Sequence, residues 1–268
     1  MTANFNQILI VDSLPDGELN TARRLFADVR DWAQVIGQLP HIAHLRISSG
    51  RAFLDLLSQL ARQASRAPYV PLLHIECHGQ EEGLQFADGS SLTWIDMKPS
   101  FVALNVATRL NLITVVAACY GGAIASFVRA EQRAPFWAFL APKRRISAGD
   151  LEMSLSAFYQ ALLRTRSSER AMDALRATRA GDEFWQLTVQ TIYRLIVEDY
   201  AENHLNQEAV QRLAERLRAR AQEQGVAWSQ AELEAIIRDP AILERFHRDF
   251  FMIDLYPEHA ERFPPVAV

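Results

Sequence analysis

The chain has 268 residues, of which 49% are hydrophobic and 22% charged, proportions typical of a folded globular protein. Its formal net charge of −4 does not suggest nucleic acid or anionic lipid as a partner. No apolar run approaches the roughly 18 residues that a membrane span requires, and the first residues lack the pattern of a secretory signal. We therefore expect a cytoplasmic protein with no membrane partner and no nucleic-acid partner.

Strands and helices alternate through the first two thirds of the chain. Apolar runs predict strands at residues 7–12, 44–47, 69–75, 112–118 and 136–140. Three- and four-residue spacing predicts helices at residues 18–37, 51–64, 96–110, 122–129 and 150–162. The pair Asp88-Gly89 predicts a hairpin within residues 83–92. This alternation predicts an α/β fold with a mostly parallel sheet that helices cover on both faces.

The strand signal disappears after about residue 180. Amphipathic helices are predicted at residues 184–199 and 206–222, followed by a capping box formed by Ser229 and Glu232. Asp239 and Pro240 then begin a helix that runs to about residue 251. We therefore expect an α/β domain at residues 1–180 and a helical extension at residues 181–268 with a regulatory role.

A histidine and a cysteine each follow a predicted buried strand. His78 comes shortly after the strand at residues 69–75, and Cys119 directly follows the run at 112–118. Because ligands bind at the carboxyl ends of parallel strands, we expect His78, Cys119 and Asp12 to meet at one sheet edge. An imidazole that takes the thiol proton and later gives it to a leaving amine is the arrangement of a cysteine hydrolase.

The residues beside the cysteine fit the same chemistry. The helix expected at 122–129 would place amide groups near Cys119, where they stabilise an anion. The backbone N–H groups of Gly79 and Cys119 are candidate donors to the oxyanion of a tetrahedral intermediate. Gly79 and Gly121 lack a Cβ, so a substrate backbone could approach closely at these positions.

These motifs resemble the caspase-like (clan CD) cysteine peptidases, most closely the prokaryotic group that includes CHAT domains. The matching pieces are the strand ending in His78-Gly79, the hairpin with Asp88-Gly89 and Leu92-Thr93, and the strand ending in Ala118-Cys119. Helical patterns at residues 155–163 and 171–175 also fit, so the resemblance covers residues 7–180. It implies a caspase-like three-layer sandwich and an endopeptidase without a cofactor, with His78 as general base and Cys119 as nucleophile.

The resemblance also indicates a substrate-binding region. In the family, the pocket for the residue before the scissile bond draws on the end of the first strand and on the segments near the nucleophile, here Asp12, Ala117, Tyr120 and Gly121. An acid at Asp12 would favour a basic substrate residue, although many basic-specific relatives also have an acid where this chain has Ala117. Residues 143–145, Lys-Arg-Arg, would then be a self-cleavage loop, whereas Arg144 and Arg145 could instead favour an acidic substrate.

The family context implies an effector of bacterial antiphage immunity or programmed cell death. Such an enzyme would act on a protein or peptide and would be activated by a small signalling molecule or a partner protein. Two alternatives stay open: a non-catalytic sensor or adaptor that holds a ligand or peptide at the same edge, and a zinc site made of His74, Cys77, His78 and Cys119. His74 is expected to be packed in the core, and Glu76 is a candidate for orienting His78. The chain has no nucleotide-binding motif and no GxSxG motif.

Overall fold

The computed structural model describes residues 5–37, 40–204, 207–223 and 227–265. The chain divides into two compact units. The α/β unit comprises Met1–Val128 and Pro135–Val189, and the helical unit comprises Arg129–Ala134 and Gln190–Val268. Among the described helices, none has the length and apolar character that crossing a membrane requires.

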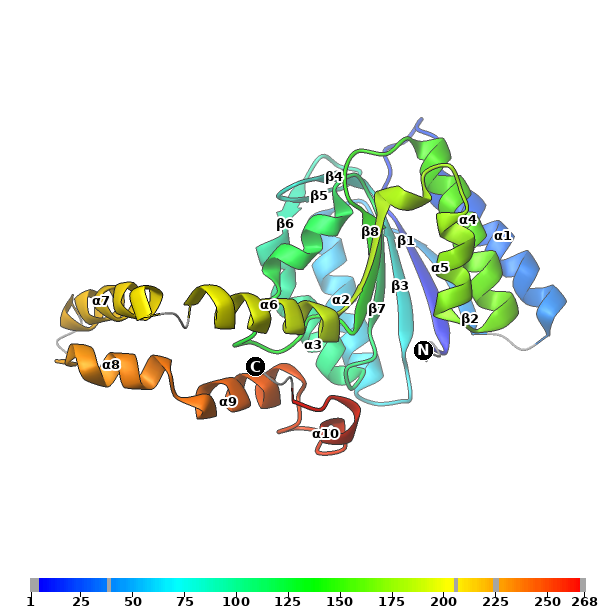
Figure 1. Ribbon diagram of the computed structural model, residues 1–268. Coiled ribbons are helices and arrows are strands. Elements are labelled where there is room, and N and C mark those ends of the chain that lie inside the picture. The colour runs from blue at the N-terminus through cyan, green and yellow to red at the C-terminus, as the bar shows by residue number, and fades with distance from the viewer. Residues whose placement is uncertain (1–4, 38–39, 205–206, 224–226, 266–268) are drawn as a thin grey trace. The chain divides into compact units, whose positions relative to one another are not determined.

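A six-stranded sheet forms the centre of the α/β unit (Figure 1), with the strand order β2-β1-β3-β7-β8-β9. The strands are β1 (Gln7–Asp12), β2 (His41–Arg46), β3 (Pro71–Glu76), β7 (Ile113–Ala117), β8 (Ala138–Pro142) and β9 (Phe184–Thr188). The first five are parallel to their neighbours, and β9 is antiparallel to β8. β3 and β7 are buried along their whole length and β1 along all but its first residue, which explains why the sequence shows continuous apolar runs.

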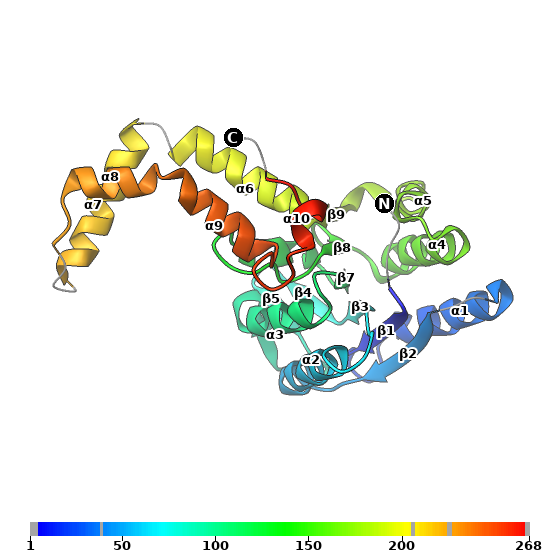
Figure 2. The ribbon, with the colours of Figure 1, turned by 90° about the horizontal axis from the view of Figure 1, so that it is seen from below.

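Helices cover both faces of this sheet (Figures 1 and 2). One face carries α1 (Thr21–Ile36), α4 (Ala148–Thr165) and α5 (Ser168–Arg176), and the other carries α2 (Gly50–Ala64) and α3 (Trp94–Ala107). On the first face, Ile8, Ile10 and Val115 of the sheet belong to one buried cluster with Leu25 and Phe158 of the helices. On the second, ring contacts run through Phe53, Phe86, Phe101, Phe127, Phe136 and Phe139. The sequence prediction of an α/β fold with a mostly parallel sheet is therefore confirmed.

A second, small sheet follows β3 directly. Its antiparallel strands are β4 (His78–Gln80), β5 (Gly83–Gln85) and β6 (Ser91–Thr93). The predicted hairpin joins β5 to β6: Gly89 has a φ of 84°, and the Asp88 carboxylate accepts a hydrogen bond from the Ser90 backbone N–H at 2.8 Å. Because His78 is the first residue of β4, its backbone belongs to a sheet instead of a free loop.

Two elements differ from the sequence prediction. The segment that begins two residues after Cys119 is a 3-10 helix, η1 (Gly121–Phe127), where an α-helix was expected. Residues 184–199 were expected to form one helix, but β9 occupies the first five of them. The helical spacing arose because a short edge strand continues directly into α6 (Val189–His204). The α/β unit accordingly extends to Val189, beyond the expected boundary at residue 180, with the short η2 (Gly181–Glu183) before the strand.

The helical unit contains most of α6 and the helices α7 (Gln207–Glu223), α8 (Gln230–Ile237), α9 (Pro240–Phe250) and α10 (His259–Arg262). The predicted capping box at Ser229 and the Asp239 cap are both present. One small core joins α7 to α8 through Val210, Ala214, Leu233 and Ile237. An aromatic cluster formed by Tyr193, His247, Phe250, Phe251 and Phe263 makes a second core.

The short stretch Arg129–Ala134 lies in the chain between η1 and β8 yet packs with the helical unit. The Arg133 guanidinium binds both carboxylate oxygens of Asp254, at 2.8 and 2.6 Å. The Ala134 N–H donates a hydrogen bond to the Phe250 carbonyl at 3.1 Å. Two separate stretches of the chain therefore build this unit.

Candidate active site

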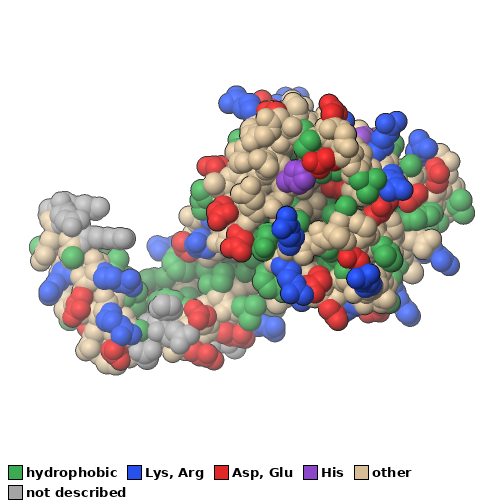
Figure 3. Space-filling view, turned by 90° about the horizontal axis from the view of Figure 1, so that it is seen from above, with side chains coloured by type: hydrophobic (Ala, Val, Ile, Leu, Met, Phe, Trp, Pro, Cys, Tyr) green, Lys and Arg blue, Asp and Glu red, His purple; other side chains and the backbone are tan. Residues whose placement is uncertain are grey.

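The sheet brings His78 and Cys119 to one edge. β3 and β7 are adjacent and parallel, with Glu76 paired to Ala117, so each residue lies two positions beyond the end of its strand. An open cavity of about 340 Å³ at this edge is lined by His78, Gly79, Gln80, Glu81, Glu82, Cys119, Tyr120 and Arg145. Figure 3 views the molecule from above and shows acidic and basic side chains interspersed over its surface. The predicted meeting of the thiol and imidazole at one cavity is thus present.

Gly79 lies against the backbone of Cys119. A Cβ at position 79 would come within 2.0 Å of the Cys119 carbonyl oxygen and 2.9 Å of its nitrogen. Glycine is therefore required here by the contact between two strand ends, and the space that we expected a substrate backbone to use is filled by protein. The same contact places the N–H groups of both residues in one small region.

The chain turns sharply after Cys119. Tyr120 has a φ of 57°, a left-handed conformation that is uncommon for a residue other than glycine, and its N–H donates to the Arg144 carbonyl at 3.2 Å. Gly121 is buried, and a Cβ there would lie 2.9 Å from the Val116 carbonyl oxygen. Of the residues predicted for substrate binding around the nucleophile, Tyr120 lines the cavity, whereas Gly121 lies in the packed interior.

The thiol and the imidazole both have other partners. The Cys119 Sγ lies 3.7 Å from the Ile146 carbonyl oxygen, to which it donates. The His78 Nε2 lies 3.0 Å from the Glu18 carboxylate, and the two side chains are 46% and 45% exposed. Among the described residues, no hydrogen bond joins the Cys119 sulfur to the His78 ring. Glu18 was missed because the sequence placed it at the start of the helix predicted at residues 18–37. In the structure α1 begins at Thr21, and Glu18 lies in the loop that follows β1.

Asp12 does not line the cavity. It is completely buried, and its carboxylate accepts hydrogen bonds from the Leu14 N–H at 3.0 Å and the Asn20 side-chain amide at 2.6 Å. The His44 Nε2 lies 3.4 Å from the same carboxylate. The expectation that Asp12 binds a substrate residue is therefore wrong, because its oxygens are used to fix the loop that follows β1. Ala117 is also misplaced by the prediction, since it belongs to the hydrophobic core.

A buried polar network lies beneath this edge. Both ring nitrogens of His74 are engaged, Nδ1 with the Tyr159 hydroxyl at 3.0 Å and Nε2 with the Glu76 carboxylate at 3.1 Å. The Thr21 hydroxyl also donates to Glu76. Burial, together with the nearby Glu76 charge, raises the pKa of Tyr159 well above its ordinary value. Glu76 therefore binds His74 and not His78, and His74 is the packed histidine that the sequence suggested.

The two cysteines lie in different surroundings. Cys77 is 4% exposed, whereas Cys119 is partly exposed and lines the cavity. Burial, and then the charges of Glu76 and Asp12, raise the pKa of the Cys77 thiol far above its ordinary value. Cys77 is therefore held as an unreactive thiol, and Cys119 is the candidate nucleophile.

The loop between β8 and α4 carries the basic residues predicted as a self-cleavage site. Arg144 forms an ion pair with Glu183, with Nε donating to the carboxylate at 2.6 Å. The Lys143 ammonium donates to the Asp182 carbonyl, also at 2.6 Å. Arg145 alone of the three lines the cavity, where Glu81 and Glu82 are also exposed. Arg145, Glu81 and Glu82 are therefore the arginine and glutamate side chains that line this cavity.

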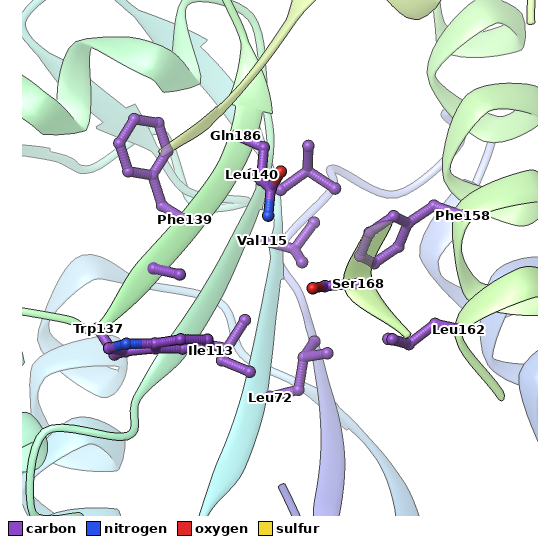
Figure 4. Close-up of a pocket in the computed structure, with 11 residues that line it drawn as sticks. Leu72, Ile113, Val115, Trp137, Phe139, Leu140, Phe158, Leu162, Ser168 and Gln186 are labelled. Carbon is purple, nitrogen blue, oxygen red and sulfur yellow. The ribbon is translucent and has the colours of Figure 1, made fainter. Parts of the chain in front are cut away.

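A second cavity lies between the sheet and helices α4 and α5 (Figure 4). Its volume is about 30 Å³, and apolar side chains such as Leu72, Ile113, Trp137 and Phe158 line it. The only polar side chains of its lining are Ser168 and Gln186. Its lining has no titratable side chain that could activate the Ser168 hydroxyl, so we regard it as a packing defect of the core.

A scan against protein-family models finds no match for this chain, and a comparison with curated proteins likewise finds none. Among the described residues, no group of three or more histidine, cysteine, aspartate or glutamate side chains could hold a metal ion. The geometry of the site presents a thiol and an imidazole at one open cavity, with the Glu18 carboxylate 3.0 Å from the imidazole.

Proposed function

We propose that this chain is a cysteine endopeptidase in which Cys119 is the nucleophile and His78 the general base. The observation that carries the proposal is that neighbouring parallel strands deliver both residues to one open cavity. The mostly parallel sheet, with helices on both faces, is compatible with the caspase-like sandwich that the sequence resembles. Cys77, the other cysteine, is buried and cannot act as the nucleophile.

The proposed reaction has two halves. His78 takes the proton of the Cys119 thiol, and the sulfur attacks the carbonyl carbon of the peptide bond. The N–H groups of Gly79 and Cys119 bind the resulting oxyanion. The C–N bond then breaks, and the imidazolium gives its proton to the leaving amine. Water, deprotonated by the same imidazole, attacks the thioester and releases the acyl part as a carboxylic acid, which restores the thiol.

The present partner of the thiol describes a resting state. The thiol donates to the Ile146 carbonyl, so it must turn towards His78 before proton transfer. Catalytic hydrogen bonds are often long before substrate binds. A resting state of this kind suits a protease that must stay inactive in its own cell. We propose an effector of bacterial antiphage immunity or programmed death that is activated by a partner protein or a small signalling molecule.

The proposed weak preference for a basic substrate residue needs a new structural basis. Asp12 is buried and its oxygens are occupied, so it cannot supply the charge. Glu81 and Glu82 are exposed at the cavity, while Arg145 is the cation of its lining. Two carboxylates against one guanidinium favour a cationic substrate by a small margin.

A non-catalytic sensor or adaptor is the second candidate. The observation that favours it is the lack, among the described residues, of a hydrogen bond between the Cys119 sulfur and His78. In that case the cavity would hold a ligand or peptide without cleaving it. Cys119 would then have no greater reactivity than an ordinary exposed thiol.

Peptide cleavage and thiol alkylation together distinguish the two functions. We expect wild-type protein to cleave peptides from a mixed library, and Cys119→Ala and His78→Ala to lower turnover by about a thousandfold or more. We also expect iodoacetamide to label Cys119 more slowly in His78→Ala than in the wild type. Wild-type protein with no turnover, together with equal labelling of Cys119 in both proteins, would favour the adaptor.

A further inference from the structure

We infer that Glu18 is a positioning residue of the proposed peptidase and that its carboxylate orients the His78 ring for proton transfer. The inference rests on the proposed function. Both carboxylate oxygens lie close to the His78 Nε2, at 3.1 Å for Oε1 and 3.0 Å for Oε2. Sequence reasoning assigned the orienting part to Glu76, which the structure instead pairs with His74.

This contact defines the chemical state of the ring. A carboxylate only accepts hydrogen bonds, so the imidazole must carry its proton on Nε2. In the neutral ring, Nδ1 then holds the lone pair that can receive a proton. The Glu18 carboxylate also lies where it can stabilise the imidazolium that forms when His78 takes the thiol proton. The orienting carboxylate of a Ser-His-Asp hydrolase has the same effect on its histidine.

The loop that carries Glu18 is fixed at both ends. The buried Asp12 holds its beginning through the Leu14 N–H and its end through the Asn20 amide. Arg46 donates to the Leu14 carbonyl at 3.1 Å. The Asn20 side chain also accepts from the Arg23 N–H at 2.7 Å and so caps α1. Asp12, which was expected to touch substrate, thus builds the support that places Glu18 beside His78.

The small contribution of the Glu18–His78 ion pair to folding stability argues against a purely structural role for it. An ion pair between two side chains that are each nearly half exposed contributes little to folding. Its main consequence is a restricted orientation and a fixed tautomer for a ring that otherwise rotates freely at the rim. Removing the buried orienting aspartate of a serine protease lowers kcat by about 10⁴. Because Glu18 is far more exposed, we expect a smaller loss of roughly tenfold.

Three substitutions of Glu18 and one neighbouring control test the inference. With a peptide that the wild type cleaves, Glu18→Ala should lower kcat about tenfold and leave KM within about twofold. Glu18→Gln, which still accepts a hydrogen bond but has no charge, should lie between the wild type and Glu18→Ala, and Glu18→Asp should restore part of the loss. The control is Asp16→Asn, on the same loop but paired with Arg46 outside the cavity lining, and it should keep wild-type kcat. Iodoacetamide labelling of Cys119 should follow the same order.

The outcomes separate this inference from the proposed function. If His78→Ala is inactive but Glu18→Ala has wild-type kcat and labelling, the inference is wrong and the endopeptidase proposal stands. An equal loss in Asp16→Asn would assign the effect to the loop and would also overturn it. If labelling of Cys119 is unchanged in both His78→Ala and Glu18→Ala and no peptide is cleaved, both proposals fall. A nitrogen-15 spectrum of the His78 ring adds a direct check, since the wild type should carry its proton on Nε2 and Glu18→Ala should show a mixture.

Discussion

Two regions of the α/β unit contain the same three kinds of side chain, and they differ in burial. Each has a cysteine, a histidine and a glutamate. The buried region contains Cys77, His74 and Glu76, and the open edge contains Cys119, His78 and Glu18. The members of the first group lie within four consecutive residues, 74–77, whereas the second group is assembled from three distant segments.

The difference between these regions shows that residue type alone does not define a reactive site. In the buried region every ring nitrogen of His74 is occupied, and the cysteine has a strongly raised pKa. Such a network is costly to disturb and gives rigidity to the strand end. At the open edge the ring of His78 has one carboxylate partner, and the thiol faces a cavity. Stability is therefore expected to depend on the first region and chemistry on the second.

The largest expected difference between the buried region and the open edge is in the reactivity of their cysteines. With iodoacetamide at neutral pH, Cys119 should be alkylated about a hundredfold faster than Cys77, because only a thiolate reacts and Cys77 is buried with a raised pKa. A raised pKa means that the protonated thiol persists as the pH increases. Cys77 should therefore stay slow even near pH 8.5, where an ordinary thiol is about half ionised. Mass spectrometry of the labelled peptides measures both rates, and fast labelling of Cys77 in folded protein would contradict this comparison.

The next contrast is in folding stability. Tyr159→Phe removes the hydroxyl that binds the His74 Nδ1 and leaves a buried polar atom unpaired, which should cost about 1–3 kcal/mol. His78→Ala at the open edge should change the free energy of unfolding by less than about 0.5 kcal/mol. Urea unfolding followed by tryptophan fluorescence compares the two variants. Equal destabilisation by both would mean that the open edge also serves the fold.

The smallest expected effect concerns substrate charge. Glu81→Gln and Glu82→Gln should each lower the ratio of kcat/KM for basic over acidic peptides by roughly 1.4- to fivefold, since an exposed ion pair contributes about 0.2–1 kcal/mol. Arg145→Gln should raise the same ratio, and the effect should weaken as salt is added. Unchanged ratios in all three variants would show that the charges at the cavity rim do not determine substrate specificity.

Much of the fold could be predicted because it depends on local periodicity. The continuous apolar runs of β1, β3 and β7 and the helical spacing of α1 and α2 gave the correct alternation of strands and helices. The edge strand β9 was missed because its residues run without a break into α6, so their spacing imitated a longer helix. The short η1 was predicted as an α-helix, since sequence spacing does not separate one or two turns of the two helix types.

The candidate site could be predicted only in part. His78 and Cys119 were found because the ends of neighbouring parallel strands meet at one edge, which is a property of the topology. The same rule wrongly placed Asp12 at the cavity. The topology determines where the backbone of β1 ends, but it does not determine the direction in which the Asp12 side chain points. Glu18 lies on a loop whose conformation depends on hydrogen bonds to Asp12 and Arg46, and such tertiary contacts leave no periodic signal in the sequence.

The stretch Arg129–Ala134 has a consequence for whether the helical unit can be removed from this protein. Residues 135–189 leave the helical unit before β8 and rejoin it after β9, so they form a covalent loop closed at both ends by that unit. Within this loop lies Ile146, whose carbonyl oxygen accepts a hydrogen bond from the Cys119 thiol. The segment that restrains the sulfur is therefore joined at both of its ends, through the chain, to the helical unit. Truncation at Val189 would leave Arg133 without Asp254, so the unit cannot be removed like a simple tail.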